Sequence, residues 1–157
     1  MSAHLERSGK FLLDAPVEEV FPLFTPRGEK AWVDGWDPEF IHPAHGRAEA
    51  GMVFRTRHGG EETLWACADF DAGRHRVRYC RLTPGSRMGF VTVACRAFGN
   101  RCAEVEVAYA LTALSPQGEA VLAEMTEAAY EGMLADWQAR ITRLLSAGCE
   151  TPARGAA

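Results

Sequence analysis

Five segments that alternate apolar and polar residues follow one another in the middle of the chain, separated only by short turns. They span residues 52–57, 62–70, 74–82, 88–98 and 102–114. The turns between them are rich in glycine, proline, asparagine and aspartate. Alternation with a period of two predicts β-strands, and parallel neighbours would need much longer crossover connections. The sequence therefore predicts an antiparallel meander and excludes a parallel βαβ arrangement.

Shorter elements precede this meander. Residues 11–13 are apolar and predict a first strand, and Asp14 after it is expected to cap a helix. Apolar spacing and start signals then predict two short helices, over residues 17–24 and 27–33. A short strand is expected at 39–42, inside a stretch rich in turn residues.

One long amphipathic helix is predicted after the last strand, from residue 116 to 145, with Ser115 as its N-cap. Its apolar residues recur at steps of three and four and form one stripe: Leu122, Met125, Ala129, Met133, Trp137, Ile141 and Leu144. Gly148 is expected to end the helix, residues 1–148 to form a single domain, and residues 149–157 to be a disordered tail. Because a curved antiparallel sheet closed by a helix can enclose a cavity, this order of elements favours ligand binding.

The composition argues against several classes of protein. A chain of 157 residues fits one domain, and its net charge of −4 gives no electrostatic reason to bind nucleic acid. The segment 1–10 is polar, which argues against a secretory signal, and no run approaches the ~18 apolar residues of a membrane span. We therefore expect a cytoplasmic protein that does not insert into a membrane. The five cysteines show no C-x-x-C spacing, so neither a disulfide framework nor a zinc knuckle is expected.

Three features carry a resemblance to a known superfamily. They are the strand–Ala-Pro–helix segment at 11–21, Trp65 on the fourth strand with Phe70 before its turn, and the long last helix with Trp137. Together they resemble the helix-grip fold of the START-like superfamily, also called the polyketide cyclase/dehydrase and lipid transport superfamily. The resemblance covers residues 8–145, and the segment 29–38 looks like that of uncharacterised bacterial members. It implies an α+β fold, in which a curved antiparallel sheet of about six to seven strands wraps around the C-terminal helix.

The same resemblance implies an apolar cavity between the sheet and this helix. Alternation along the strands and the helix stripe predict which side chains face it. We expect nine of them to bind the ligand: Trp65, Cys67, Tyr79, Arg81, Val93, Tyr109, Met125, Met133 and Trp137. Aromatic and thioether groups adapt to varied apolar ligands. The same residues could also fill an ordinary core, and the sequence leaves both alternatives open.

Arg81 is the most distinctive of these residues. An inward arginine is costly unless paired, and its planar fork suits a carboxylate on a ligand or on a neighbouring side chain. Its position near a strand end would also let it reach solvent. The hydroxyls of Tyr79 and Tyr109 could orient a polar ligand group, and His75 could act as a base. No metal or cofactor is expected, because no ligand pattern matches the three histidines of the turn regions: His42, His45 and His58.

Three functions fit these expectations. The first is binding of a small hydrophobic or amphipathic ligand, which is lipid-like, aromatic or polyketide-like, by a monomer or homodimer. The second is a cyclase or aromatase acting in the same cavity, with proton transfer or oxyanion stabilisation by its polar groups. The third is a protein-interaction module that resembles the activator domain of a chaperone ATPase, with the acidic face of the last helix as its docking surface. Fold alone does not choose among them.

Overall fold

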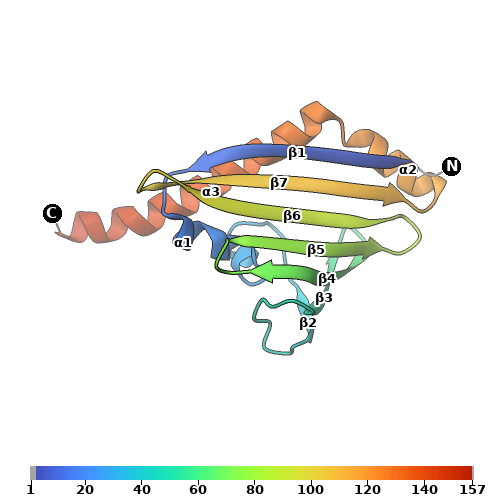
Figure 1. Cartoon of the computed structure of the whole chain (residues 1–157), viewed down its shortest axis with the longest axis horizontal. Helices are drawn as coiled ribbons and strands as arrows, with labels where there is room; N and C mark the ends of the chain where they lie inside the picture. The colour runs from blue at the N-terminus through green and yellow to red at the C-terminus, as the bar shows by residue number, and fades with distance from the viewer. Residues whose placement is uncertain (1–2, 157) are drawn as a thin grey trace.

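Seven strands form one antiparallel sheet in a computed structural model of the chain, which describes the backbone of residues 3–156 and the side chains of residues 3–146 (Figure 1). The strands are β1 (His4–Leu13), β2 (Glu39–His42), β3 (Val53–His58), β4 (Glu61–Asp71), β5 (Arg76–Thr83), β6 (Arg87–Phe98) and β7 (Cys102–Ala113). Their order in the sheet is β1-β7-β6-β5-β4-β3-β2. The predicted antiparallel meander is therefore confirmed, and β1 joins it beside the last strand.

The first strand is longer than the apolar segment 11–13 from which it was predicted. β1 begins at His4 and pairs with β7 along its whole length, from His4 opposite Thr112 to Leu13 opposite Ala103. Only the end of β1 is deeply buried. Its first half is polar and shows no alternation of apolar residues, so the sequence pattern does not predict a strand there. The backbone ladder to β7 holds this half in place, which is an effect of tertiary context.

Three short helical segments follow β1: α1 (Val17–Val20) and the 3-10 helices η1 (Phe21–Phe24) and η2 (Gly28–Ala31). The residue before α1 is Pro16, and no side chain caps this helix, so the expected cap by Asp14 is wrong. Gly28 explains how closely η2 approaches η1. A Cβ atom on it would lie 1.9 Å from the carbonyl oxygen of Pro22, so only glycine fits there.

The closing helix is broken in two, where the sequence predicted one continuous helix over 116–145. Ser115 caps α2 (Pro116–Glu124) as expected, accepting a hydrogen bond of 3.1 Å from the amide of Gly118. The backbone then leaves the helical region at Met125. The hydroxyl of Thr126 accepts a hydrogen bond of 3.1 Å from the amide of Ala129 and so caps a new helix, α3 (Glu127–Ala156).

The backbone of α3 continues past Gly148, where the sequence predicted its end. One glycine inside a helix costs only about 1 kcal/mol relative to alanine, which does not by itself end the helix. The domain boundary at residue 148 and the disorder of residues 149–157 stay predictions. Among the described residues, no helix is long and apolar enough to cross a membrane.

The long helix α3 lies across one face of the sheet, behind β1 and β7 in Figure 1. Its buried residues are Tyr130, Leu134 and Ile141, and the hydroxyl of Tyr130 donates a hydrogen bond of 2.6 Å to the carbonyl of Val107. On β1, Gly9 makes room for the helix, since a Cβ atom there would lie 2.6 Å from Leu134. The sheet thus grips the helix through close contacts on β1 and β7.

Candidate functional site

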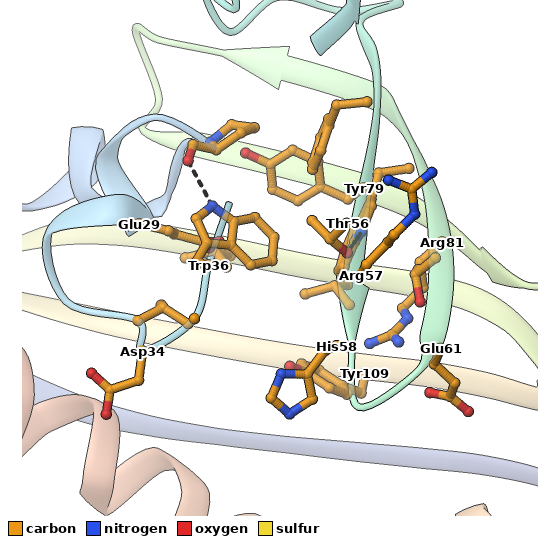
Figure 2. Close-up of a pocket in the computed structure, with 18 of the residues that line it drawn as sticks. Glu29, Asp34, Trp36, Thr56, Arg57, His58, Glu61, Tyr79, Arg81 and Tyr109 are labelled. Atoms are coloured by element: carbon orange, nitrogen blue, oxygen red, sulfur yellow. Dashed lines mark hydrogen bonds between the residues drawn. The ribbon is translucent and has the colours of Figure 1, made fainter. Parts of the chain in front are cut away.

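A cavity of about 310 Å³ lies between the sheet, the segment 26–36 and α3. Strands β3 to β7 supply one wall, the η2 segment supplies another, and Trp137 comes from α3. Figure 2 shows this space with several of its polar side chains labelled. Its volume is at the lower end of the range for small-molecule sites, roughly 300–1,000 Å³. The structure therefore contains space between the sheet and the helix that a small ligand could occupy.

All four tryptophans of the chain line this cavity: Trp32, Trp36, Trp65 and Trp137. The first three are held by hydrogen bonds from their indole N–H groups. Trp32 donates to the carbonyl of Leu23 at 2.8 Å, and Trp36 to that of Pro26 at 2.7 Å (Figure 2). Trp65 donates to the hydroxyl of Thr56 at 3.0 Å. These bonds satisfy the polar edges of the rings and leave the cavity with apolar aromatic walls.

Six of the nine residues expected to bind the ligand line the cavity: Trp65, Tyr79, Arg81, Val93, Tyr109 and Trp137. Cys67, Met125 and Met133 do not. Cys67 is buried in the core, where its thiol donates to the carbonyl of Asp69 at 3.4 Å across an irregularity of β4. Met125 lies at the break between α2 and α3, and Met133 is half-buried on α3. The break shifts the phase of the helix, so Tyr130 and Leu134 occupy the buried positions instead.

The histidines differ in whether they line the cavity. His75 is not on β5 as expected, but in the turn before it, with a φ of 57° and its ring packed against Phe21. It does not line the cavity, so it cannot act as a base there. His58, at the end of β3, does line the cavity, whereas His42 and His45 do not. No group of three metal-ligating side chains occurs among the described residues.

Arg81 extends from β5 into the cavity, although its place near the strand end would have let it reach solvent. Its Nε atom is buried and has no hydrogen-bond partner among the described residues. The guanidinium lies 4.9 Å from the ring centre of Trp65, which is the residue opposite it on β4. Burial lowers the pKa of Arg81, but an arginine keeps its charge at neutral pH. The cavity therefore contains a positive charge with an open hydrogen-bonding position.

Glu61, the nearest candidate partner for this charge, is already paired with Arg87. The two Nη atoms of Arg87 lie 3.1 Å from the two carboxylate oxygens of Glu61. This bidentate pair lowers the pKa of Glu61 and keeps it ionised. Arg87 thus uses the carboxylate that Arg81 would otherwise bind.

Glu29 is a cavity residue that the sequence analysis missed. It lies on η2 and lines the cavity on the side opposite Arg81 in the view of Figure 2. Burial raises the pKa of Glu29 well above its ordinary value, and no basic side chain among residues 3–146 offsets this effect. A carboxyl group in such a place favours its neutral, protonated form. The local sequence Gly28-Glu29-Lys30 is typical of a solvated turn, so nothing in it marks the glutamate as internal.

The two tyrosines of the cavity differ in what their hydroxyls do. Tyr79 donates a hydrogen bond of 2.8 Å to the carbonyl of Phe24 and so links β5 to η1. Tyr109 has no such bond among the described residues, and burial raises its pKa to about 12. The hydroxyl of Tyr109 therefore stays protonated and is free to donate to a ligand.

No family model matches the sequence, and no curated protein matches it either. Solved structures do match it. A norcoclaurine synthase from Thalictrum flavum, in complex with dopamine and hydroxybenzaldehyde, aligns with 92% of this chain and 87% of its own at 12% identity and a TM-score of 0.64. An aromatase/cyclase from Streptomyces sp. R1128 aligns with 92% of this chain and 95% of its own, at 13% identity and a TM-score of 0.65.

An uncharacterised protein from Rhizobium leguminosarum is also similar, with 14% identity, a TM-score of 0.66, and coverage of 91% of this chain and 97% of its own. The fold is the START-like helix grip. The expected sheet, the long C-terminal helix and the short helices after the first strand are all confirmed. At these identities the likeness shows the START-like fold alone, and the function must be argued from the cavity.

Proposed function

We propose that this protein binds a small amphipathic ligand in the cavity between the sheet and α3. The observation that carries the proposal is the cavity of about 310 Å³ whose walls include all four tryptophans of the chain. Aromatic walls favour a ring or another apolar body, because they offer large rigid contact areas. The neighbours named above support the same class of ligand, since one of them holds two small aromatic molecules.

A neutral fluorescent probe tests this proposal directly. N-phenyl-1-naphthylamine, excited apart from the tryptophans, should show saturable binding and a blue-shifted emission in the native protein. Val93→Phe places a larger side chain in the cavity and should lower the affinity about tenfold or more, which corresponds to about 1.4 kcal/mol. Val93 is buried and lines the cavity from β6.

Thr92→Phe is the matched control for this test. Thr92 is the neighbour of Val93 on β6, and its side chain lies on the opposite face of the sheet. It does not line the cavity. Equal losses in both variants would place the probe outside the cavity and overturn the proposal, as would the absence of saturable binding to the native protein.

Glu29 favours a second candidate, a cyclase-type enzyme that acts in the same cavity. A carboxyl group whose pKa is raised by burial is better suited to proton donation than an ordinary glutamate, and the hydroxyl of Tyr109 lines the same space. Glu29→Gln should then abolish turnover of a carbonyl compound that the cavity binds, while the affinity for the neutral probe stays unchanged. Unchanged turnover in this variant would rule Glu29 out as the acid.

The remaining expectations have weaker support. The cytoplasmic location, the monomer or homodimer state and the chaperone-related docking function of the third alternative stay predictions. The acidic residues proposed for docking, Glu124, Glu127 and Glu131, are exposed on α2 and α3.

A further inference from the structure

We propose that Arg81 forms an anion subsite, so that the ligand is an aromatic or otherwise apolar molecule with a carboxylate at one end. This inference rests on the proposed function, because it names the class of ligand that the same cavity takes. Four features of the structure lead to it: the guanidinium without a direct partner, its surroundings, the state of the other acids in the cavity, and the aromatic walls.

The guanidinium of Arg81 has no direct partner among the described side chains. Glu61 attracts it and raises its pKa, but the ion pair of Glu61 is with Arg87. The buried Nε of Arg81 has no hydrogen-bond partner. Glu61 is bound by both Nη atoms of Arg87, which removes the closest alternative. A charge that is withdrawn from water without a partner is costly, and a ligand carboxylate would remove this cost through a bidentate pair.

The surroundings of Arg81 support its guanidinium at the wall of the cavity. The ring of Trp65 lies 4.9 Å away and supports the cation through its face. The residue opposite Arg81 on β6 is Gly89, and the backbone of β7 lies close to it, since a Cβ atom there would be 1.9 Å from the carbonyl oxygen of Ala110.

Other polar groups near this end of the cavity are compatible with an anion. The hydroxyls of Thr63 and Thr83 bond to each other at 2.7 Å. The hydroxyl of Tyr109 also lines the cavity and is a free donor. An anionic group beside Arg81 would therefore meet a charged donor and a neutral donor, and the nearest acid is already neutralised.

The two remaining acids of the cavity, Glu29 and Asp34, do not neutralise Arg81. Asp34 is paired with Arg140 at 2.7 Å, and neither Glu29 nor Asp34 contributes to the pKa of Arg81. Burial raises the pKa of Glu29 and so favours its neutral form, whereas Arg81 carries a positive charge. A ligand with its ring among the tryptophans and its carboxylate on Arg81 matches this distribution of charge.

The test compares two probes of the same size and shape. Naphthalene-2-carboxylate is anionic at pH 7.5, and naphthalene-2-carboxamide is its neutral counterpart. Quenching of tryptophan fluorescence reports both, because all four tryptophans line the cavity. The native protein should bind the carboxylate about tenfold or more tightly than the amide, a difference of about 1.4 kcal/mol.

Variants of β5 assign this preference to Arg81. Arg81→Met should remove the preference and leave the affinity for the amide within about twofold, whereas Arg81→Lys, which keeps the charge but loses the planar fork, should retain part of it. Arg78→Met is the matched control. Arg78 lies three residues earlier on the same strand, exposed on the other face of the sheet and 4.0 Å from the ring centre of Phe90. That variant should keep the full preference for the carboxylate.

The outcomes separate the two proposals. If the native protein binds both naphthalene compounds equally, or if Arg81→Met keeps the preference, the anion subsite is overturned while the ligand-binding function stands. If neither compound nor the neutral probe binds, both proposals fail. Should Arg81→Met not fold, the comparison in the native protein and in Arg81→Lys still decides the question.

Discussion

At the residue scale, the most informative side chains are the polar groups inside the cavity. Among them, Glu29 makes the stability of the protein depend on pH. Its pKa in the folded protein is raised above the ordinary value of 4.5, because burial disfavours the charged form. Below the pKa of the unfolded chain the group is protonated in both states, and its contribution to stability is fully present. As the pH rises, the unfolded chain ionises first, so this contribution falls until the pH passes the folded pKa.

We therefore expect Glu29→Gln to gain stability relative to the native protein as the pH rises from 4.5 to 8. Urea unfolding across this range measures the difference between the two free energies of unfolding. Other carboxyl groups, such as Glu61 with its lowered pKa, make the protein more stable as the pH rises. Both proteins contain these groups, so their effect cancels in the comparison. Glu131→Gln, an exposed change on α3, is the control. If the curves for Glu29→Gln and the native protein run parallel, Glu29 is not the buried acid described above.

The three tyrosines of the chain provide a matched series. The hydroxyls of Tyr79 and Tyr130 each donate to a backbone carbonyl, at 2.8 and 2.6 Å, whereas that of Tyr109 does not. Replacing either donor by phenylalanine should lower the free energy of unfolding by about 1–2 kcal/mol, because a buried carbonyl loses its partner. Tyr109→Phe should cost almost nothing. Equal losses at all three positions, measured by chemical denaturation, would contradict these hydrogen-bond assignments.

Strand alternation predicted several of the cavity residues on the sheet but could not find Glu29. Tyr79, Arg81 and Tyr109 face inward because side chains alternate along a strand, and this rule needs only the sequence. Glu29 lies on a 3-10 turn, whose direction depends on how closely Gly28 approaches the backbone of Pro22. Such a contact has no signature in the local pattern of apolar residues.

At the scale of elements, the break between α2 and α3 decides which helix residues face the sheet. Met125 leaves the helical conformation, and Thr126 starts the new helix by accepting a hydrogen bond from Ala129. The phase of the apolar stripe therefore changes at the break. A sequence reading that assumes one continuous helix places Ala129 and Met133 inward, where the structure has Tyr130 and Leu134.

This cap can be tested by Thr126→Ala. Loss of the capping hydroxyl should reduce the free energy of unfolding by about 0.5–2 kcal/mol, as is usual for threonine at an N-cap. Thr142→Ala, an exposed change within α3, is the control and should be neutral or slightly stabilising, since alanine is the better helix former. If thermal and urea unfolding show the same stability for both variants, Thr126 does not cap α3.

At the scale of the whole molecule, the sheet and α3 enclose space that is not filled by side chains. Val93 lines this space, whereas Val105 is fully buried on β7 and does not line it. Val93→Phe should change the free energy of unfolding by less than about 1 kcal/mol, because the added ring enters the cavity. Val105→Phe should lose about 1–3 kcal/mol from overpacking. Similar losses in the two variants, measured by urea unfolding, would mean that the cavity is closed in solution.

The overall architecture was predictable because its strongest signals are local. Short turns between alternating strands require antiparallel neighbours, and one apolar stripe after the last strand requires a covering helix. The cavity was not predictable in the same way. Its volume depends on how the segment 26–36 packs over the sheet, with Trp36 bonded to Pro26 and Trp32 to Leu23. The same residue types line cavities in some proteins and fill cores in others, so the sequence of this segment does not predict which of the two it forms.

The account rests on the claim that a ligand enters the space lined by the four tryptophans. The most direct measurement is a titration of the ¹⁵N-labelled protein with N-phenyl-1-naphthylamine, followed through the indole N–H resonances. We predict that all four indole signals shift along one saturation curve, and that this curve moves to about tenfold or more higher probe concentration in Val93→Phe. Saturable binding that leaves the four indole signals unmoved, or no binding at all, would contradict the proposal that this cavity is the ligand site.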